Sequence, residues 1–210
     1  MDSELTIIGK KYNTDKSTYH GFTDFYNKHL SAYRDEFQNI LEIGVFNGSS
    51  LKMWKEYFTK SKILAIDIYD KKVFNDDRIS TFICDQSDKN TLNDIFQGIT
   101  FDMIIDDGSH IMSHQQLSFI YLFDKLKSGG FYIIEDLHTS LRPGQYGNDN
   151  NKATTLEFLR SLYNKSDFSS SFISIEMFNF FLDRIEKVEI IENPQNDEFG
   201  SSITSIIYKK

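Results

Sequence analysis

The chain has 210 residues, of which 40% are hydrophobic and 26% charged, a balance that suits one globular domain with a full core. A formal net charge of −8 without a stretch rich in Lys and Arg argues against nucleic-acid binding, because contacts to phosphates need clustered basic side chains. The single cysteine excludes an internal disulfide, and no segment resembles a secretory signal or a membrane span. We therefore expect a cytoplasmic protein that binds no membrane.

The first two thirds of the chain predict a cap followed by alternating strands and helices. Residues 18–36 predict one or two helices, and residues 1–37 are expected to form a helical cap on a single domain spanning 1–210. Short apolar runs predict buried strands at 39–45, 63–69, 80–85, 101–107 and 130–136. The segments between them predict helices at 49–58, 90–96 and 113–126. Such alternation is typical of βαβ units, and hence of a parallel sheet with helices on both faces.

The last third of the chain predicts a loop, a helix and a hairpin. Residues 137–151 are polar and are expected to form a loop over the active site, followed by a helix at 152–164. The Phe-rich stretch 172–184 fits either a helix or a strand. Runs at 187–193 and 202–210 predict an antiparallel hairpin at one sheet edge. Together these patterns predict an α/β fold: a doubly wound, mostly parallel, seven-stranded Rossmann-like methyltransferase sheet with an antiparallel C-terminal hairpin.

The first predicted strand leads into a glycine-containing turn, Glu42-x-Gly44-x-x-Asn47-Gly48-x-Ser50. Its glycines let the backbone approach a ligand closely at the carboxyl ends of the strands. Nicotinamide and flavin dinucleotides need G-x-G-x-x-G, whose second glycine admits a pyrophosphate. Glu42 would repel a phosphate, but it is favourable beside the ammonium and sulfonium of S-adenosylmethionine. The turn therefore predicts this methyl donor as the cofactor.

Acidic and amide side chains end the next two predicted strands. Asp67 is placed to accept hydrogen bonds from ribose hydroxyls, and Asp85 with Gln86 could read an adenine edge. Glu42 or Asp67 alone could merely cap a helix. As a set, these residues predict an adenosine pocket.

An acidic cluster follows the fourth and fifth predicted strands, which end in DDGSH (106–110) and in Glu135-Asp136. A right-handed crossover of one helix would set the two strand ends about 5 Å apart. Four crowded carboxylates repel one another, and at least one would be pushed towards its protonated form. A divalent cation removes this repulsion. Oxygen ligands suit Mg²⁺, with Mn²⁺ or Ca²⁺ as substitutes.

A histidine lies beside this cluster. An alcohol is a weak acid, so its methylation benefits from a cation that stabilises the alkoxide and from an imidazole that takes the proton. His110 follows Asp107 closely and is the expected general base. His114 is expected behind the site or on the surface, and His138 is the alternative base. His110 alone could be a packed or capping histidine, but the neighbouring carboxylates favour the catalytic role.

The motifs ILEIGVFNGSSLKMW, AIDIYD, CDQSD, FDMIIDDGSH and GGFYIIEDLHTS together resemble the sugar O-methyltransferases of macrolide biosynthesis (mycinamicin and macrocin type), and also cephalosporin hydroxylase-like proteins. The similarity covers roughly residues 13–140. Residues 12–16 echo a G-[ST]-D-K segment near that family's cofactor site, although Asn13 replaces the usual Gly. The resemblance implies His110 as the base and a set of metal ligands consisting of Asp107, Glu135 and Asp136. The expected cofactor contacts are Thr14, Lys16, Glu42, Gly44, Asn47, Ser50, Asp67, Asp85, Gln86 and Asp106.

The function predicted from the sequence is S-adenosylmethionine- and Mg²⁺-dependent O-methylation of a sugar hydroxyl, on a nucleotide sugar, deoxysugar or glycan. A catechol-type small-molecule O-methyltransferase is an alternative, because catechols also offer a vicinal diol to a metal. A non-catalytic protein that binds S-adenosylmethionine is another, but it would need neither metal nor base. The extra N-terminal domain of the larger macrolide enzymes has no counterpart in these residues, so a homo-oligomer is left open.

Overall fold

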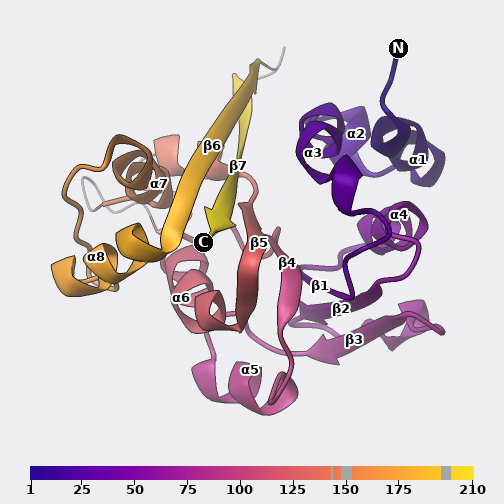
Figure 1. Ribbon diagram of the computed structural model, residues 1–210, viewed down its shortest axis with the longest axis horizontal. Coiled ribbons are helices and arrows are strands. Elements are labelled where there is room, and N and C mark those ends of the chain that lie inside the picture. Colours follow the sequence, from indigo (N-terminus) through magenta and orange to yellow (C-terminus); the bar gives the residue numbers. More distant parts are fainter. Residues whose placement is uncertain (143, 148–152, 195–199) are drawn as a thin grey trace.

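A mixed sheet forms the centre of the computed structural model, which describes residues 1–142, 144–147, 153–194 and 200–210. The strands are β1 (Asn39–Ile43), β2 (Lys62–Asp67), β3 (Ile79–Ile83), β4 (Phe101–Asp106), β5 (Leu126–Ile134), β6 (Ile185–Pro194) and β7 (Ser201–Lys209). In these ranges the order is β3-β2-β1-β4-β5-β7-β6 (Figure 1). The pairs among β1 to β5 are parallel, and β7 is antiparallel to both of its neighbours. This confirms the predicted sheet and its C-terminal hairpin.

Helices cover both faces of the sheet, and each face has its own core. One core is formed by α1 (Glu4–Tyr12), α3 (Thr23–Leu30) and α4 (Ser49–Tyr57), with the short α2 (Asp15–Thr18) beside them. The other is formed by α5 (Lys89–Ile95), α6 (Met112–Leu122), α7 (Thr155–Asn164) and α8 (Ile175–Arg184) (Figure 1). Short 3-10 turns are η1 (Ser31–Tyr33), η2 (Lys72–Phe74), η3 (Phe123–Lys125) and η4 (Leu137–Leu141).

Side chains alternate between the two cores along the strands, and this separates neighbouring acidic residues. In β4, Ile104 belongs to the core under α6, and Ile105 to the core under the N-terminal cap. The same alternation directs Asp106 towards α6 and Asp107 towards the cap. The two adjacent aspartates therefore serve different sites.

The N-terminal cap contains more helix than the sequence located. The predicted helical stretch 18–36 contains α3 and η1, and α1 and α2 begin before it. Ser3 caps α1, since its Oγ accepts a hydrogen bond from the Thr6 amide, which explains why a helix starts there. The ambiguous stretch 172–184 resolves as the helix α8, whose first turn is capped by Ser174.

The start of the fifth strand was predicted wrongly, and the segment after the strand begins with a short 3-10 turn. β5 begins at Leu126 and runs through its glycine pair, because Gly130 packs against β4: a Cβ there would lie 2.9 Å from the Asp102 carbonyl oxygen. The predicted loop 137–151 begins instead as η4, which is partly buried because the Leu156 amide of α7 donates to Ser140 Oγ at 3.2 Å. Residues 143 and 148–152 of that prediction lie outside the described residues.

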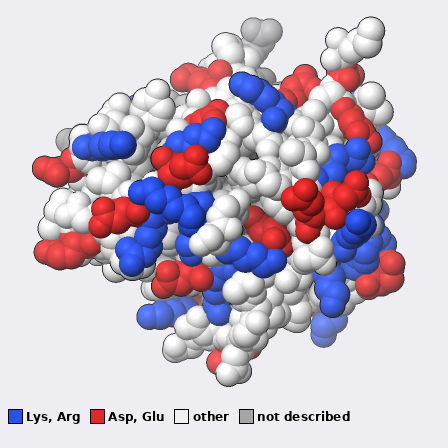
Figure 2. Space-filling model, in the orientation of Figure 1, with Lys and Arg blue, Asp and Glu red and all other residues white. Residues whose placement is uncertain are grey.

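The surface carries both signs of charge. On the face shown in Figure 2, acidic and basic side chains of the described residues are interspersed. None of the helices in the described part of the chain is both long enough and apolar enough to cross a bilayer.

Candidate active site

A cavity of about 900 Å³ opens at the carboxyl ends of the parallel strands. Its walls come from the loops that follow β1, β2, β3 and β4, and from residues 13–18 of the cap. The strand order reverses between β1 and β4, and such a switch point is where open α/β sheets bind their ligands.

Most of the residues predicted for the site line this cavity. They are Thr14, Gly44, Asn47, Ser50, Asp67, Asp85, Gln86, Asp107, His110 and Asp136. The other predicted residues, Lys16, Glu42, Asp106 and Glu135, are buried behind the wall. The site therefore has a cavity-facing layer and a buried polar layer.

The glycine turn after β1 is fixed by close backbone packing. Gly44 has φ 89°, and a Cβ there would lie 2.1 Å from the Asp107 carbonyl oxygen. Asp67 Oδ2 accepts a hydrogen bond from the Val45 amide at 3.0 Å, while its Oδ1 accepts one from the Tyr69 amide at 2.9 Å. Asp67 thus joins the loops after β1 and β2 at the edge of the cavity.

Gln86, on the cavity wall, and Asp106, behind it, form a buried pair that holds the neighbouring loops. The Gln86 amide nitrogen lies 3.0 Å from both Asp106 carboxylate oxygens, and its Oε1 accepts from the Ser109 amide at 2.9 Å. Ser118 of α6 also donates to Asp106, and burial raises the pKa of this carboxyl. The predicted crowding of four carboxylates does not occur, because Asp106 points to the other side of the sheet.

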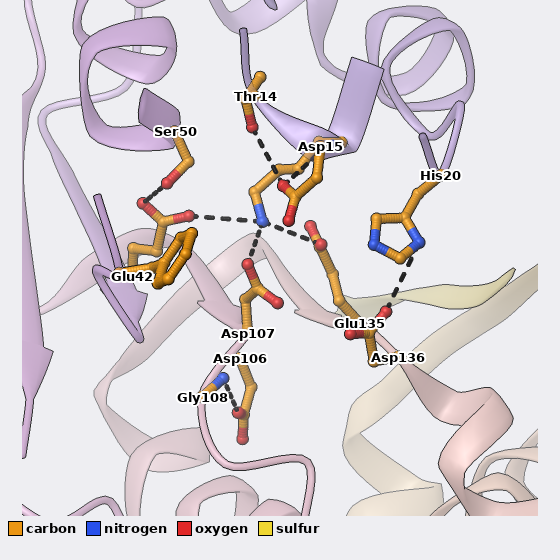
Figure 3. A network of polar contacts seen from close by, with 12 residues as sticks. Thr14, Asp15, His20, Glu42, Ser50, Asp106, Asp107, Gly108, Glu135 and Asp136 are labelled. Atoms are coloured by element: carbon orange, nitrogen blue, oxygen red, sulfur yellow. Dashed lines mark hydrogen bonds and ion pairs between the residues drawn. The ribbon is translucent and has the colours of Figure 1, made fainter. Parts of the chain in front are cut away.

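A buried lysine, Lys16, holds the remaining carboxylates together. Figure 3 labels these carboxylates, Glu42, Asp107 and Glu135. Lys16 Nζ donates to Asp107 Oδ2 and, at 2.9 Å, to Glu135 Oε2, and it lies 3.6 Å from Glu42 Oε1. Burial alone would lower the pKa of Lys16, but the three carboxylates outweigh it and hold the pKa well above its ordinary value. The sequence prediction of a direct cofactor contact for Lys16 did not anticipate this arrangement.

The two glutamates have further partners. Glu42 accepts hydrogen bonds from Ser50 Oγ at 3.0 Å and from the Trp54 indole at 3.3 Å, and burial raises its pKa to about 7. Glu135 Oε1 accepts one from the Tyr26 hydroxyl at 2.9 Å, and burial raises the pKa of Glu135 well above its usual range. Both glutamates are thus built into the protein interior.

A second group of side chains, whose atoms could bind a metal ion, faces the cavity. Asp107, His110 and Asp136 each offer one ligand atom, and these atoms lie within 4.8 Å of one another. His110 Nε2 is 3.4 Å from Asp136 Oδ2, while His110 Nδ1 and Asp136 Oδ1 are buried without hydrogen-bond partners. Two carboxylates and an imidazole with unsatisfied buried atoms suit a divalent cation. This group differs from the predicted ligand set in containing His110 and not Glu135.

Backbone strain concentrates at the cavity. Six non-glycine residues of the described chain have positive φ, and four of them line the cavity: Asn13, Phe46, His110 and Asp136. Asn13 is the C-cap of α1, where asparagine readily adopts this conformation. For the other three it costs about 1–3 kcal/mol each, and such residues cluster at functional sites. The packing around the cavity therefore holds these residues against their local preference.

Three further histidines lie near the site. His138 Nδ1 and His20 Nδ1 are each 3.8 Å from Asp136 Oδ1, and burial lowers the pKa of His138. His20 was missed by sequence reasoning, because nothing in its sequence context links it to Asp136. His114 lines the cavity and lies 3.0 Å from Ser109 Oγ.

Comparison with known proteins places this geometry in context. No protein-family model matches the chain. The chain is 38% identical over 167 residues to the 8-demethyl-8-alpha-L-rhamnosyl tetracenomycin-C 2'-O-methyltransferase of Streptomyces olivaceus, covering 75% of this chain and 44% of that protein. It is also 38% identical over 171 residues to the mycinamicin VI 2''-O-methyltransferase of Micromonospora griseorubida, with 76% and 43% covered. The chain is a relative of sugar O-methyltransferases.

Solved structures agree with this relationship. The MycE methyltransferase of mycinamycin biosynthesis, in complex with Mg, SAH and mycinamycin VI, superposes with a TM-score of 0.79 at 30% identity, over 99% of this chain and 55% of that one. A putative caffeoyl-CoA O-methyltransferase from Staphylococcus aureus, at 12% identity and a TM-score of 0.59, shares the fold alone. The Rossmann-like methyltransferase fold and the predicted resemblance are confirmed. The chain spans about half the length of the relatives it matches.

Proposed function

We propose that this protein is an S-adenosylmethionine- and Mg²⁺-dependent O-methyltransferase that acts on a sugar hydroxyl of a small molecule. The observation that carries the proposal is the cavity-facing group of Asp107, His110 and Asp136 in a chain related to sugar O-methyltransferases. A protein that only binds the cofactor would not need, at that position, carboxylates and an imidazole with unsatisfied buried atoms on a strained backbone.

The two ends of the cavity have different tasks in this proposal. Gly44, Asp67 and Asp85 at one end would bind the adenosine and methionine parts of the cofactor, with Asn47 and Thr14 in the adjoining wall. Asp107 and Asp136 at the other end would hold Mg²⁺, which stabilises an alkoxide when bound. The unsatisfied oxygen of Asp136 supports this assignment.

His110 would take the proton of the acceptor hydroxyl. Its imidazole lies on the cavity wall, next to the proposed ion and to Asp136. The remaining rate acceleration would come from holding the hydroxyl in line with the methyl group, since orientation alone can remove a large part of the activation barrier. The named acceptors of the relatives support a sugar on a small molecule as the class of acceptor.

The proposal is tested by methyl transfer from S-adenosylmethionine to a panel of nucleotide sugars, glycosides and catechols. EDTA should abolish transfer to a sugar and added Mg²⁺ should restore it. Asp136→Asn should lose activity with the fold intact, whereas Asp167→Asn, an exposed change away from the cavity, should keep it. Full activity in EDTA would exclude a role for the metal and leave His110 with Asp136 as the groups that take the proton. Transfer to catechols alone would replace the sugar assignment.

A further inference from the structure

Three large apolar side chains are exposed along one end of the cavity wall. Phe46, in the loop after β1, has an exposed fraction of 81%, and Ile68 and Tyr69, which follow β2, are also largely exposed. All three line the cavity. β1 and β2 are neighbouring parallel strands, so the two loops leave the sheet side by side (Figure 1). These residues therefore form an apolar rim at the end of the cavity that the proposed function assigns to the cofactor.

The backbone of Phe46 is held in a conformation that phenylalanine disfavours. Its φ is 45°, in the left-handed region, where a residue with a large side chain is rare and strained. Asp67 Oδ2 accepts a hydrogen bond from the Phe46 amide at 3.4 Å, and Lys71 Nζ donates one to the Phe46 carbonyl oxygen at 2.6 Å. Side chains of the β2 loop thus hold the strained turn by both its amide and its carbonyl.

This strain does not serve the core of the protein. The Phe46 side chain belongs to neither hydrophobic core, and a glycine would adopt the same turn at lower cost. A strained backbone that presents an aromatic ring at a cavity indicates that the ring has a partner there. Its position favours the cofactor as that partner, because the Phe46 amide is bound to Asp67, the residue expected to face the ribose.

We propose that Phe46 is a cofactor-binding residue, whose ring packs against S-adenosylmethionine beside the ribose. Lys71 is a positioning residue, which holds the Phe46 turn through its carbonyl oxygen. The exposed apolar surface of the ring is covered when the cofactor binds, and this burial contributes to affinity. The inference rests on the proposed function, because it presupposes S-adenosylmethionine as the cofactor.

The first test compares Phe46→Gly with the wild type by calorimetric titration of S-adenosylhomocysteine into the full chain. The variant should bind at least about tenfold more weakly, since burial of a phenylalanine side chain supports a change of that order. Its Tm without ligand should stay within about 2 °C of the wild type, because relief of backbone strain offsets the greater freedom of glycine in the unfolded chain. Phe46→Tyr keeps the ring and should bind within about threefold of the wild type.

Val73→Ala is the matched control, because Val73 of η2 is 84% exposed but does not line the cavity. It should bind S-adenosylhomocysteine as the wild type does. Binding by Phe46→Gly within about threefold of the wild type overturns the proposal. Weaker binding together with a Tm more than about 5 °C lower would show a structural role, and overturns it too. So does a changed oligomeric state with unchanged affinity, since a second copy of the chain would then cover the ring.

The second test asks whether Lys71 acts through Phe46. Lys71→Met should weaken S-adenosylhomocysteine binding about three- to tenfold in the wild type and have little further effect in Phe46→Gly, because the ring that it positions is then absent. Equal losses in both backgrounds overturn the positioning role. A wild type that binds no S-adenosylhomocysteine contradicts the proposed function and with it the role of Phe46. A wild type that binds it no more tightly than Phe46→Gly contradicts the role of Phe46 alone.

Discussion

His110 combines a strained backbone with an imidazole directed at a carboxylate. Its φ of 58° is unfavourable for a side chain with a Cβ, and its Nε2 lies 3.4 Å from Asp136 Oδ2. A carboxylate beside an imidazole stabilises the imidazolium that forms when the ring accepts a proton. The residue is therefore suited to act as a base at a fixed position.

His110→Ala should lower kcat by about 10²–10⁴-fold, the usual worth of general-base assistance. The affinity for S-adenosylhomocysteine should hardly change, because the imidazole would contact the acceptor. His114→Ala is the matched control, since His114 also lines the cavity but is bound to Ser109, and it should keep most of the activity. Steady-state kinetics and calorimetry measure both quantities. A kcat for His110→Ala within about twofold of the wild type would transfer the role to His138.

Gly44→Ala should disable the cofactor end of the cavity. The new Cβ would meet a backbone oxygen at 2.1 Å, so the loops after β1 and β4 would have to move apart. We expect the free energy of unfolding to fall by at least about 2 kcal/mol. The affinity for S-adenosylhomocysteine should fall as well. Gly129→Ala is the control, because its φ is also positive, 75°, but no atom lies within 4 Å of its Cβ. Similar losses in both variants would show that backbone conformation, and not close packing, is what matters at Gly44.

At the scale of elements, one tyrosine joins the cap, the sheet and the hairpin. Tyr26 of α3 donates to Glu135, which follows β5, and its hydroxyl lies 2.8 Å from Thr204 Oγ1 of β7. Tyr26 is fully buried, so water cannot replace these contacts. These contacts fix the cap to the end of β5 and to β7, at residues more than a hundred positions further along the sequence.

Tyr26→Phe should destabilise the protein by about 1–3 kcal/mol, because it leaves a buried carboxylate oxygen without a donor. For a domain of this size, each kcal/mol lowers the Tm by about 2–4 °C. Tyr57→Phe removes a hydroxyl that donates to Asn27 Oδ1 at 3.0 Å, a part-buried bond to an uncharged oxygen, and should cost about 1 kcal/mol. Calorimetric unfolding compares the two. An unchanged Tm in Tyr26→Phe would show that the hydrogen bonds of the Tyr26 hydroxyl make no net contribution to stability.

The elements that could be predicted are those whose pattern is local. Buried parallel strands read as apolar runs, so the sheet followed from the sequence. No helix was placed over Glu4–Tyr12, although Ser3 before Glu4 is a local capping signal that could have located its start. The extension of β5 was missed because it depends on the contact of Gly130 with β4, a partner that the local pattern does not contain.

The same reason limits the prediction of the site. Gly44, Asp67 and Asp107 end strands, and the topology alone brings strand ends together. The role of Lys16 depends on a fold contact across 119 residues, which no local pattern encodes. One usable signal was overlooked: strand alternation already separates Asp106 from Asp107.

For the whole molecule, ligand binding should appear as thermal stabilisation. S-adenosylhomocysteine at about a hundred times its Kd adds about 2.7 kcal/mol, which corresponds to a Tm increase of roughly 5–10 °C. NAD at the same concentration should leave the Tm unchanged, because Val45 and Phe46 follow Gly44 where a pyrophosphate would need a further glycine. Differential scanning fluorimetry compares them. A shift with NAD and none with S-adenosylhomocysteine would contradict the cofactor assignment.

The place of β7 between β5 and β6 has a consequence for synthesis. A ribosome makes β5 and β6 before β7, yet β6 pairs only with β7, and β7 pairs with β5. Until residues 201–209 have been translated, β5 presents an open, apolar edge and β6 has no place in the sheet. Such edges in a nascent chain are prone to pair with other chains. Between translation of Ile134 and of Lys209, we therefore expect the open edge of β5 to be the part of the sheet most prone to pair with another chain.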